Sequence, residues 1–227
     1  MPVMKRIVCL ANSRKLHGRC VAGVELVDGR PAGWLRPVSA REHQEVSEYE
    51  RQYEDGSDPR LLDIIDVPLL EARPKDYQQE NWLLDPEHYW QKRGTFAWNQ
   101  LGRIADSTGT LWRNGCHTYN GVNDQIRLTE ACLEDHSLKL IYVDGMRLRV
   151  FAPGAAFGNA KRRVQVRFLF SGSDYALWVT DPRIERAYLA KDDGEYHFGE
   201  CYLTVSLGEP FNEHCHKLIA AVLEGPR

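Results

Sequence analysis

His214 and His216, which are separated by one residue, are candidates for binding a catalytic metal ion. On a strand both imidazoles would point to one face and could share a metal ion, with Glu213 or Cys215 assisting. A metal-dependent enzyme acting on nucleotides or nucleic acid is therefore one alternative function. No second group of ligating residues has a recognisable spacing, and the GxGxxG, GxxxxGK, HExxH and GxSxG patterns are absent. We accordingly expect incidental histidines, no catalytic residues and no cofactor.

A second kind of chemistry, the binding of phosphates, is available to two basic stretches. The first follows the apolar run RIVCLA and comprises Asn12, Ser13, Arg14 and Lys15, with Arg19 across an expected hairpin. Arg and Lys neutralise phosphates, while Asn and Ser donate hydrogen bonds to phosphates or base edges. We expect the four residues to form the hairpin turn and to bind nucleic acid; the alternative is an ordinary polar turn.

The second basic stretch comprises Lys161, Arg162 and Arg163, which follow a glycine-containing loop. Arg163, Gln165 and Arg167 then alternate with apolar residues, so they share one face of an expected strand. A basic strand face with an aromatic residue nearby can follow the backbone of a single strand. The alternative is a solvated face, which is usual in antiparallel sheets.

Trp34 and Arg36 form a third candidate, because a tryptophan between basic residues can stack on a base. The tryptophans at 82, 90 and 98 are more typical of partly buried positions.

Charge is segregated along the chain, although the formal net charge is −3. Residues 1–36 carry seven Lys or Arg against two acids, and residues 137–172 carry seven against one. Residues 42–100 carry six against fourteen. The local electrostatic potential decides where a polyanion docks. The two basic segments therefore favour nucleic-acid binding although the net charge of the chain is negative. The acidic stretch 42–58 is expected to be solvated, or to bind a partner protein.

Short strands dominate the expected structure. Apolar runs bounded by Gly, Pro and Asp predict strands over 6–11, 20–27, 34–39, 61–72, 162–170, 175–182 and 196–211. Asp144-Gly145 between two apolar runs predicts a hairpin over 138–152. Residues 41–60 are expected to form a short helix or a loop, residues 81–106 are expected to be partly helical, and residues 216–225 fit either type.

This pattern, without long alternating helices, favours small barrels or sandwiches over a doubly wound sheet. We place one domain at 1–125, including the acidic and Trp-rich insert, and a second at 126–227. The segment 107–124 is turn-rich and is expected to connect the two halves.

Several blocks spread over nearly the whole chain resemble the dual OB-containing domain family of prokaryotes. They are RIVCLANSRKLHGRCVAG, GWLRPVS, ERQYEDGSDPRLLDIIDVPLLEA, ENWLLD and KLIAAVL. The resemblance implies a mainly β protein of two tandem OB-like β-barrels with an irregular, partly helical insert. It also implies nucleic-acid binding, in settings linked to defence against foreign genomes. The His214-Cys215-His216 triplet is not part of this resemblance.

The favoured function is non-catalytic binding of single-stranded or structured DNA or RNA, as a recognition module of a prokaryotic defence system. There are two alternative functions, namely the metal-dependent enzyme and a protein-interaction module that uses the acidic segment. No run approaches the roughly 18 apolar residues of a membrane span, and no signal peptide precedes MPVMKRIVCL. We therefore expect a cytoplasmic protein that does not bind membranes.

Overall fold

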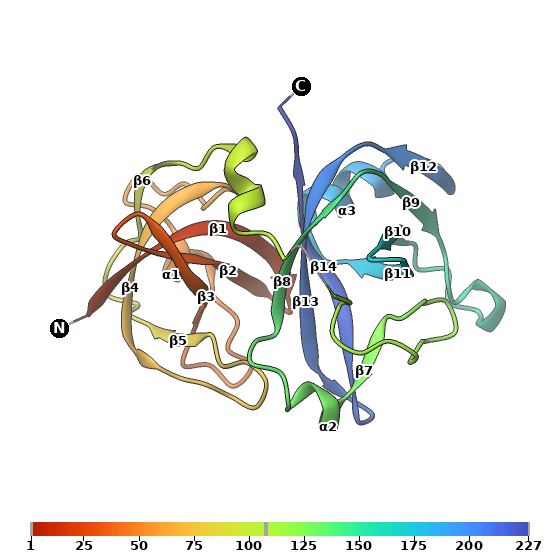
Figure 1. Ribbon diagram of the computed structural model, residues 1–227, viewed down its shortest axis with the longest axis horizontal. Coiled ribbons are helices and arrows are strands. Elements are labelled where there is room, and N and C mark those ends of the chain that lie inside the picture. Colours follow the sequence, from red (N-terminus) through yellow and green to blue (C-terminus); the bar gives the residue numbers. More distant parts are fainter. Residues whose placement is uncertain (1, 107–108, 227) are drawn as a thin grey trace. The chain divides into compact units, whose positions relative to one another are not determined.

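The computed structural model describes residues 2–106 and 109–226, and it divides the chain into two compact units (Figure 1). Unit 1 comprises Met1–Ile104 and Asp135–Ser137, and unit 2 comprises Ala105–Glu134 and Leu138–Arg227. The division therefore falls after residue 104, whereas the sequence pattern placed it after residue 125. Both units are built mainly from strands, as predicted.

Unit 1 is a closed ring of strands. Its strands are β1 (Val3–Lys15), β2 (Gly18–Val27), β3 (Arg30–Val38), β4 (Asp63–Ala72), β5 (Asn81–Leu84) and β6 (Gln91–Thr95). The pairings run β1–β2–β3–β5–β4 and return to β1, with β6 added beside β4. Only the β3–β5 pairing is parallel among these strands. Such closure removes the exposed sheet edges.

The first strand closes this ring by pairing with two partners. Its residues Val3–Val8 pair with β4, and its residues from Ile7 onward pair with β2. A β-bulge lies between Cys9 and Ala11, where β2 comes close: a Cβ on Gly23 would stand 2.1 Å from the carbonyl oxygen of Val8. Glycine is therefore required at position 23.

The core of unit 1 is formed mainly by residues from its strands. Its fully buried members come from every long strand of the ring, and they include Ile7, Cys9, Val21, Leu35, Ile65, Val67 and Leu69. The polar stretch after β3 forms only one short helix, α1 (Glu48–Arg51), which starts with a capping box between Ser47 and Glu50. After β6 the chain forms the 3-10 helix η1 (Trp98–Arg103).

Unit 2 repeats the same order of strands with extra pieces. Its elements are β7 (Gln125–Arg127), α2 (Leu128–Ala131), β8 (Leu138–Val143), β9 (Met146–Phe151), η2 (Ala155–Phe157), β10 (Arg163–Phe170), β11 (Ser173–Val179), α3 (Pro182–Leu189), β12 (Gly194–Phe198), β13 (Cys201–Phe211) and β14 (His214–Glu224). The sheet runs β12–β9–β10–β11–β14–β13–β8, and β11–β14 is parallel. In this order β8 and β9 together correspond to β1, while β13 and β14 correspond to β4 and β5.

The predicted hairpin at Asp144-Gly145 is wrong. β8 pairs with β13, whereas β9 pairs with β10 and β12. The two strands therefore follow one another along the sheet and do not pair with each other. A type I′ turn needs positive φ at both central residues, and neither Asp144 nor Gly145 has it. The dipeptide therefore bends the chain from one partner strand to the other. The open prediction for residues 216–225 is also resolved, because all of them except the last belong to β14.

A segment of irregular chain, residues 110–124, is bound to unit 2 and is called the strap below. Its start is fixed by the hydroxyl of Tyr175, which accepts a hydrogen bond from the Leu111 amide at 3.1 Å. The ammonium group of Lys217, a fully buried side chain, donates to the carbonyl of Arg113 at 2.7 Å and to Asn114 at 3.2 Å. Further along, Val122 and Ala176 exchange backbone hydrogen bonds. The strap is thus an ordered part of unit 2.

None of the helices in the described ranges is both long and apolar enough to cross a membrane.

Candidate nucleic-acid interface

Many basic side chains of unit 1 are neutralised by carboxylates within the unit. Lys5 pairs with Glu25 at 2.8 Å, and Arg51 pairs with Asp58 at 2.8 Å. Both Arg6 and Arg93 contact the carboxylate of Asp66 at 2.6 Å, and the Arg6 hydrogen bond is the main cause that lowers the pKa of Asp66. The basic composition of residues 1–36 is therefore partly consumed by internal ion pairs.

The polar run after RIVCLA is not a turn, contrary to the prediction. Asn12 to Lys15 continue β1 and pair with β2, and the turn consists of Leu16 and His17. Leu16 has a φ of 48°, which is typical of a tight connection. The strand continues because each of these residues finds a partner on β2.

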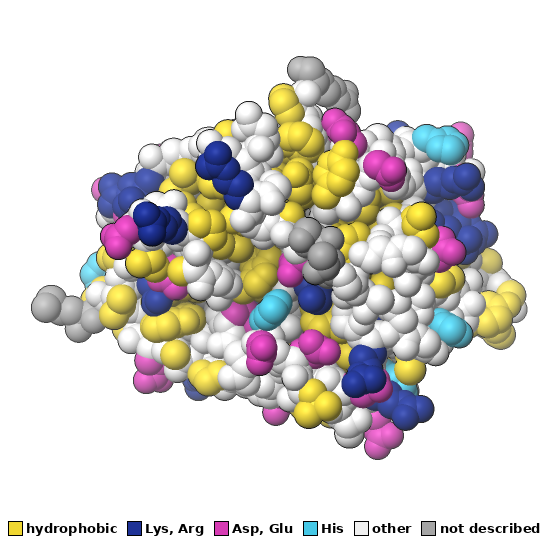
Figure 2. All heavy atoms as spheres, in the orientation of Figure 1, with side chains coloured by type: hydrophobic (Ala, Val, Ile, Leu, Met, Phe, Trp, Pro, Cys, Tyr) yellow, Lys and Arg dark blue, Asp and Glu magenta, His cyan; other side chains and the backbone are white. Residues whose placement is uncertain are grey.

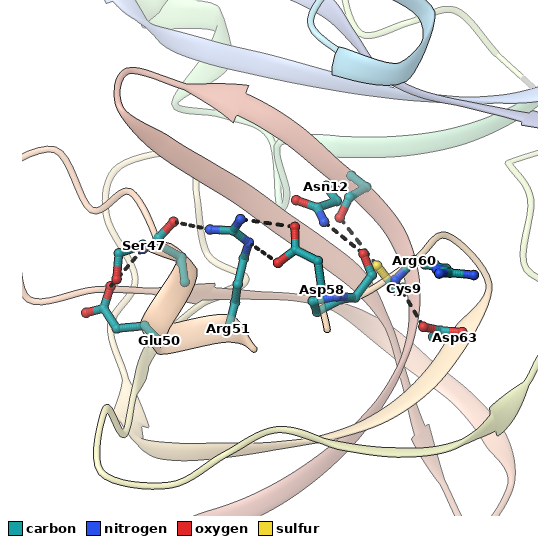
Figure 3. A network of polar contacts seen from close by, with 11 residues as sticks. Cys9, Asn12, Ser47, Glu50, Arg51, Asp58, Arg60 and Asp63 are labelled. Carbon is teal, nitrogen blue, oxygen red and sulfur yellow. Dashed lines mark hydrogen bonds and ion pairs between the residues drawn. The ribbon is translucent and has the colours of Figure 1, made fainter. Parts of the chain in front are cut away.

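Asn12 and Ser13 serve the barrel itself. The Asn12 amide donates to the carbonyl of Pro59 at 2.9 Å, next to the contact between Arg51 and Asp58 (Figure 3). Ser13 is 5% exposed and donates to the Cys20 carbonyl. These two residues are turned toward the protein, so the expectation that they contact nucleic acid is not supported by their position.

Arg14 is exposed and lies directly opposite Arg19 across the β1–β2 pair, while Lys15 is half-buried at the end of β1. These three basic residues remain a candidate patch of unit 1.

Arg36, predicted with Trp34 to bind nucleic acid, is buried, so its position does not favour that role. Its side chain is buried, pairs with the buried carboxylate of Glu80 at 2.9 Å, and donates to the hydroxyl of Ser137 at 2.7 Å. Burial of an arginine requires such partners. Its predicted companion Trp34 is half-buried and lies opposite Val24 of β2.

Unit 2 gathers basic and aromatic side chains on one face of its sheet. We call this the cationic face and define it by Arg147, Arg149, Phe151, Arg163, Arg167, Trp178 and His197. The strands place them together because alternate residues share a face: Arg163 lies opposite Phe151, and Arg167 lies opposite Arg147. His197 of β12 lies opposite Arg147 on its other side. Figure 2 shows Lys and Arg side chains gathered at the edge formed by β9 and β12.

Four side chains of this face form a continuous stack. The guanidinium of Arg149 lies over the ring of Phe151 at 4.1 Å, and Phe151 stacks on Trp178 with centroids 5.7 Å apart. The guanidinium of Arg163 lies over the Trp178 ring at 4.1 Å. A guanidinium that stacks through its plane keeps the N–H donors at its edge for hydrogen bonds, and its position is fixed. The stack therefore holds two arginines in place on the face.

The other basic residues predicted near position 160 lie in different environments. Arg167 is exposed, and no carboxylate of the described ranges lies within ion-pair distance of it. Lys161 is exposed in the loop before β10. Arg162, by contrast, is held by Asp193 at 2.6 Å and by the carbonyl of Leu189 at 3.0 Å. The structure thus brings Arg163 and Arg167 together on one face and engages Arg162 elsewhere.

Gln165, predicted to share an exposed strand face with Arg163 and Arg167, is fully buried because the strap covers it. Its amide donates to the carbonyl of Asn120 at 2.7 Å. The face is therefore divided, with the strap over its middle and arginines on both sides.

Sequence reasoning did not identify Arg147, Arg149, Phe151, Trp178 and His197 as parts of the site. The alternation in MRLRVF was a usable signal for the two arginines and Phe151. Nothing local in the sequence placed Trp178 or His197 beside them.

The two histidines considered as metal ligands lie on β14. His214 contacts the carbonyl of Asn212 at 2.9 Å, and His216 is half-buried with a pKa lowered mainly by burial. The charge of Arg163 also lowers the pKa of His216, although less than burial does. In the ranges that the structure describes, no group of three or more His, Cys, Asp or Glu side chains is arranged to hold a metal ion.

Comparison with known proteins agrees with this architecture of two similar β units. The model of the dual OB-containing domain matches residues 5–222. No curated protein and no solved structure matches the chain. Because the match spans nearly the whole sequence, the chain belongs to the dual OB-containing domain family.

Proposed function

We propose that the protein binds nucleic acid through the cationic face of unit 2, without performing chemistry on it. The observation that carries this proposal is the stack Arg149–Phe151–Trp178–Arg163, which fixes two guanidinium groups on one face of the sheet. OB-folds bind oligonucleotides on the face of their second and third strands. In unit 2 those strands correspond to β10 and β11, which supply Arg163, Arg167 and Trp178.

The charge balance of the face favours a polyanion. Four arginines lie on it, and one of them, Arg147, has the carboxylate of Glu195 at 3.9 Å. Both side chains of that pair are about half exposed, so water screens it and it contributes little. Phosphates of a bound strand would replace water around these arginines and release counterions.

Two exposed aromatic residues border the face and supply platforms for bases. Tyr119 and Phe157 are 88% and 78% exposed, and their rings meet edge to face with centroids 6.4 Å apart. Tyr119 precedes Asn120, whose carbonyl contacts Gln165 on β10. A base stacked on such a ring contributes about 1–3 kcal/mol to binding.

The test is a titration of fluorescent single-stranded DNA, single-stranded RNA and duplex DNA at several salt concentrations. We expect binding that weakens steeply with salt, with a log–log slope of about −0.7 per phosphate contacted on a single strand. The double variant Arg149→Gln/Arg163→Gln should weaken binding and make the slope shallower by about 1.4. Arg186→Gln, on the exposed side of α3, is the matched control and should leave both unchanged.

Absence of binding at low salt would overturn the proposal. A slope that the double variant leaves unchanged would also overturn it, provided that circular dichroism shows the variant to be folded. The three probes decide between single strands and duplexes, and between DNA and RNA.

A further inference from the structure

A pocket of about 530 Å³ opens at one end of the cationic face. Its lining comes from the start of β9, the end of β10, the start of β11 and the end of β12, so the four strands meet there at the same end of the sheet. The residues that matter for its chemistry are Arg147, Arg167, His197, Asp174, Leu169 and Phe198.

Three basic side chains form one row across this pocket. Arg167, Arg147 and His197 are directly opposite one another on three neighbouring strands. Neighbouring strands are about 4.8 Å apart, so the whole row spans about 10 Å. Like charges directly opposite each other destabilise a sheet, and the only carboxylate within 4 Å of the two arginines in the described ranges is Glu195, at 3.9 Å from Arg147. An anion seated in the pocket would relieve this repulsion.

The number of positive groups indicates which anion fits best. An internal phosphodiester carries one negative charge, whereas a phosphomonoester carries about −1.5 to −2 at neutral pH. Two guanidinium groups, with an imidazole beside them, match the more highly charged group. Arginine also binds phosphate oxygens through two parallel N–H donors, so two arginines can hold one phosphate from two sides.

The other walls fit the nucleotide that carries the phosphate. Leu169 is 59% exposed at the pocket, and Phe198 lies on the β12 side, so both offer apolar surface to a sugar or a base. Asp174 of β11 also lines the pocket, and its carboxylate can accept a hydrogen bond from a hydroxyl or an exocyclic amino group. A carboxylate at this place would also repel a second phosphate, which favours the end of a chain over its middle.

We propose that this pocket holds the terminal phosphomonoester of a nucleic-acid strand that lies on the cationic face. This inference rests on the proposed nucleic-acid binding. A free nucleoside monophosphate offers the same chemical group, so the experiment must distinguish the two sources.

The experiment compares three labelled oligonucleotides of one sequence: 5′-phosphorylated, 3′-phosphorylated and without terminal phosphate. We expect one phosphorylated form to bind about tenfold more tightly than the form without phosphate. The variant Arg147→Gln/Arg167→Gln should abolish this preference. Arg149→Gln, which lies on the same face but does not line the pocket, should weaken all three oligonucleotides by the same factor and keep the preference.

The outcomes separate this inference from the proposed function. Equal binding of all three oligonucleotides, or a preference that Arg147→Gln/Arg167→Gln retains, overturns the phosphate pocket and leaves nucleic-acid binding in place. Failure to bind any of them overturns both. Unlabelled nucleoside 5′- and 3′-monophosphates are added as competitors. If either displaces the phosphorylated strand at concentrations close to that of an unlabelled strand, the pocket recognises a free nucleotide, and the strand-end proposal is wrong.

Discussion

The buried lysine at position 217 predicts an unusual dependence of stability on pH. Burial lowers the pKa of Lys217 to about 8 from its ordinary value of 10.5. The native state therefore releases a proton that the unfolded chain still binds between pH 8 and 10.5, so the free energy of unfolding rises with pH in that range. The linkage relation gives a gain of about 2 kcal/mol between pH 8 and pH 10. The neutral amine keeps two N–H donors for its two acceptors, the Arg113 carbonyl and Asn114.

The assay is urea unfolding of the wild type and of Lys217→Met, followed by tryptophan fluorescence at pH 8 and pH 10. The substitution removes the hydrogen bonds to the strap at both pH values, so the loss that it causes through these bonds cancels in the comparison. The free energy of unfolding of the wild type, relative to that of the variant, should increase by about 2 kcal/mol at the higher pH.

The exposed Lys161→Met is the control and should show no such increase. If wild type and Lys217→Met follow parallel pH profiles, Lys217 does not lose its proton in this range and the reasoning is wrong.

Two further predictions concern unit 1. Glu80→Gln leaves the buried guanidinium of Arg36 without its carboxylate and should lower the free energy of unfolding by about 3–5 kcal/mol, measured with urea, whereas the exposed Glu87→Gln should change it little. A loss below 1 kcal/mol would mean that water or another group compensates Arg36. Gly23→Ala places a Cβ against the Val8 carbonyl and should cost about 1–3 kcal/mol, measured in the same way, while Gly94→Ala meets nothing within 4 Å. Equal effects at the two glycines would contradict the close approach of β1 and β2.

The strands were largely predictable because their apolar residues recur locally. The alternation around Val164 and Val166 placed β10 correctly, and apolar runs located most of β1 and β4. The pairing of strands was harder to predict from the sequence. Asp144-Gly145 has the composition of a hairpin turn, but β8 pairs with β13, which lies far along the chain, and β9 pairs with β10, the strand that follows it. Tertiary pairing therefore overrode a strong local signal.

The site was only partly predictable for the same reason. Arg163 and Arg167 could be assigned to a common face from their spacing, and the structure places them there. Arg36 could not be recognised as buried, because its partners Glu80 and Ser137 are 44 and 101 positions away. The covering of Gln165 by the strap could not be predicted either. The composition of the strap is typical of a connector, and its contact with Gln165 joins residues that are distant in sequence.

The stack on the cationic face constrains what unit 2 can discriminate. Phe151 and Trp178 face each other, and guanidinium groups already cover them at 4.1 Å. An incoming nucleobase would have to displace an arginine before it could intercalate there. In the proposed binding mode the stack itself therefore contacts the sugar–phosphate chain and does not read the bases, so a methyl group added to a base would leave the contacts of the stack unchanged.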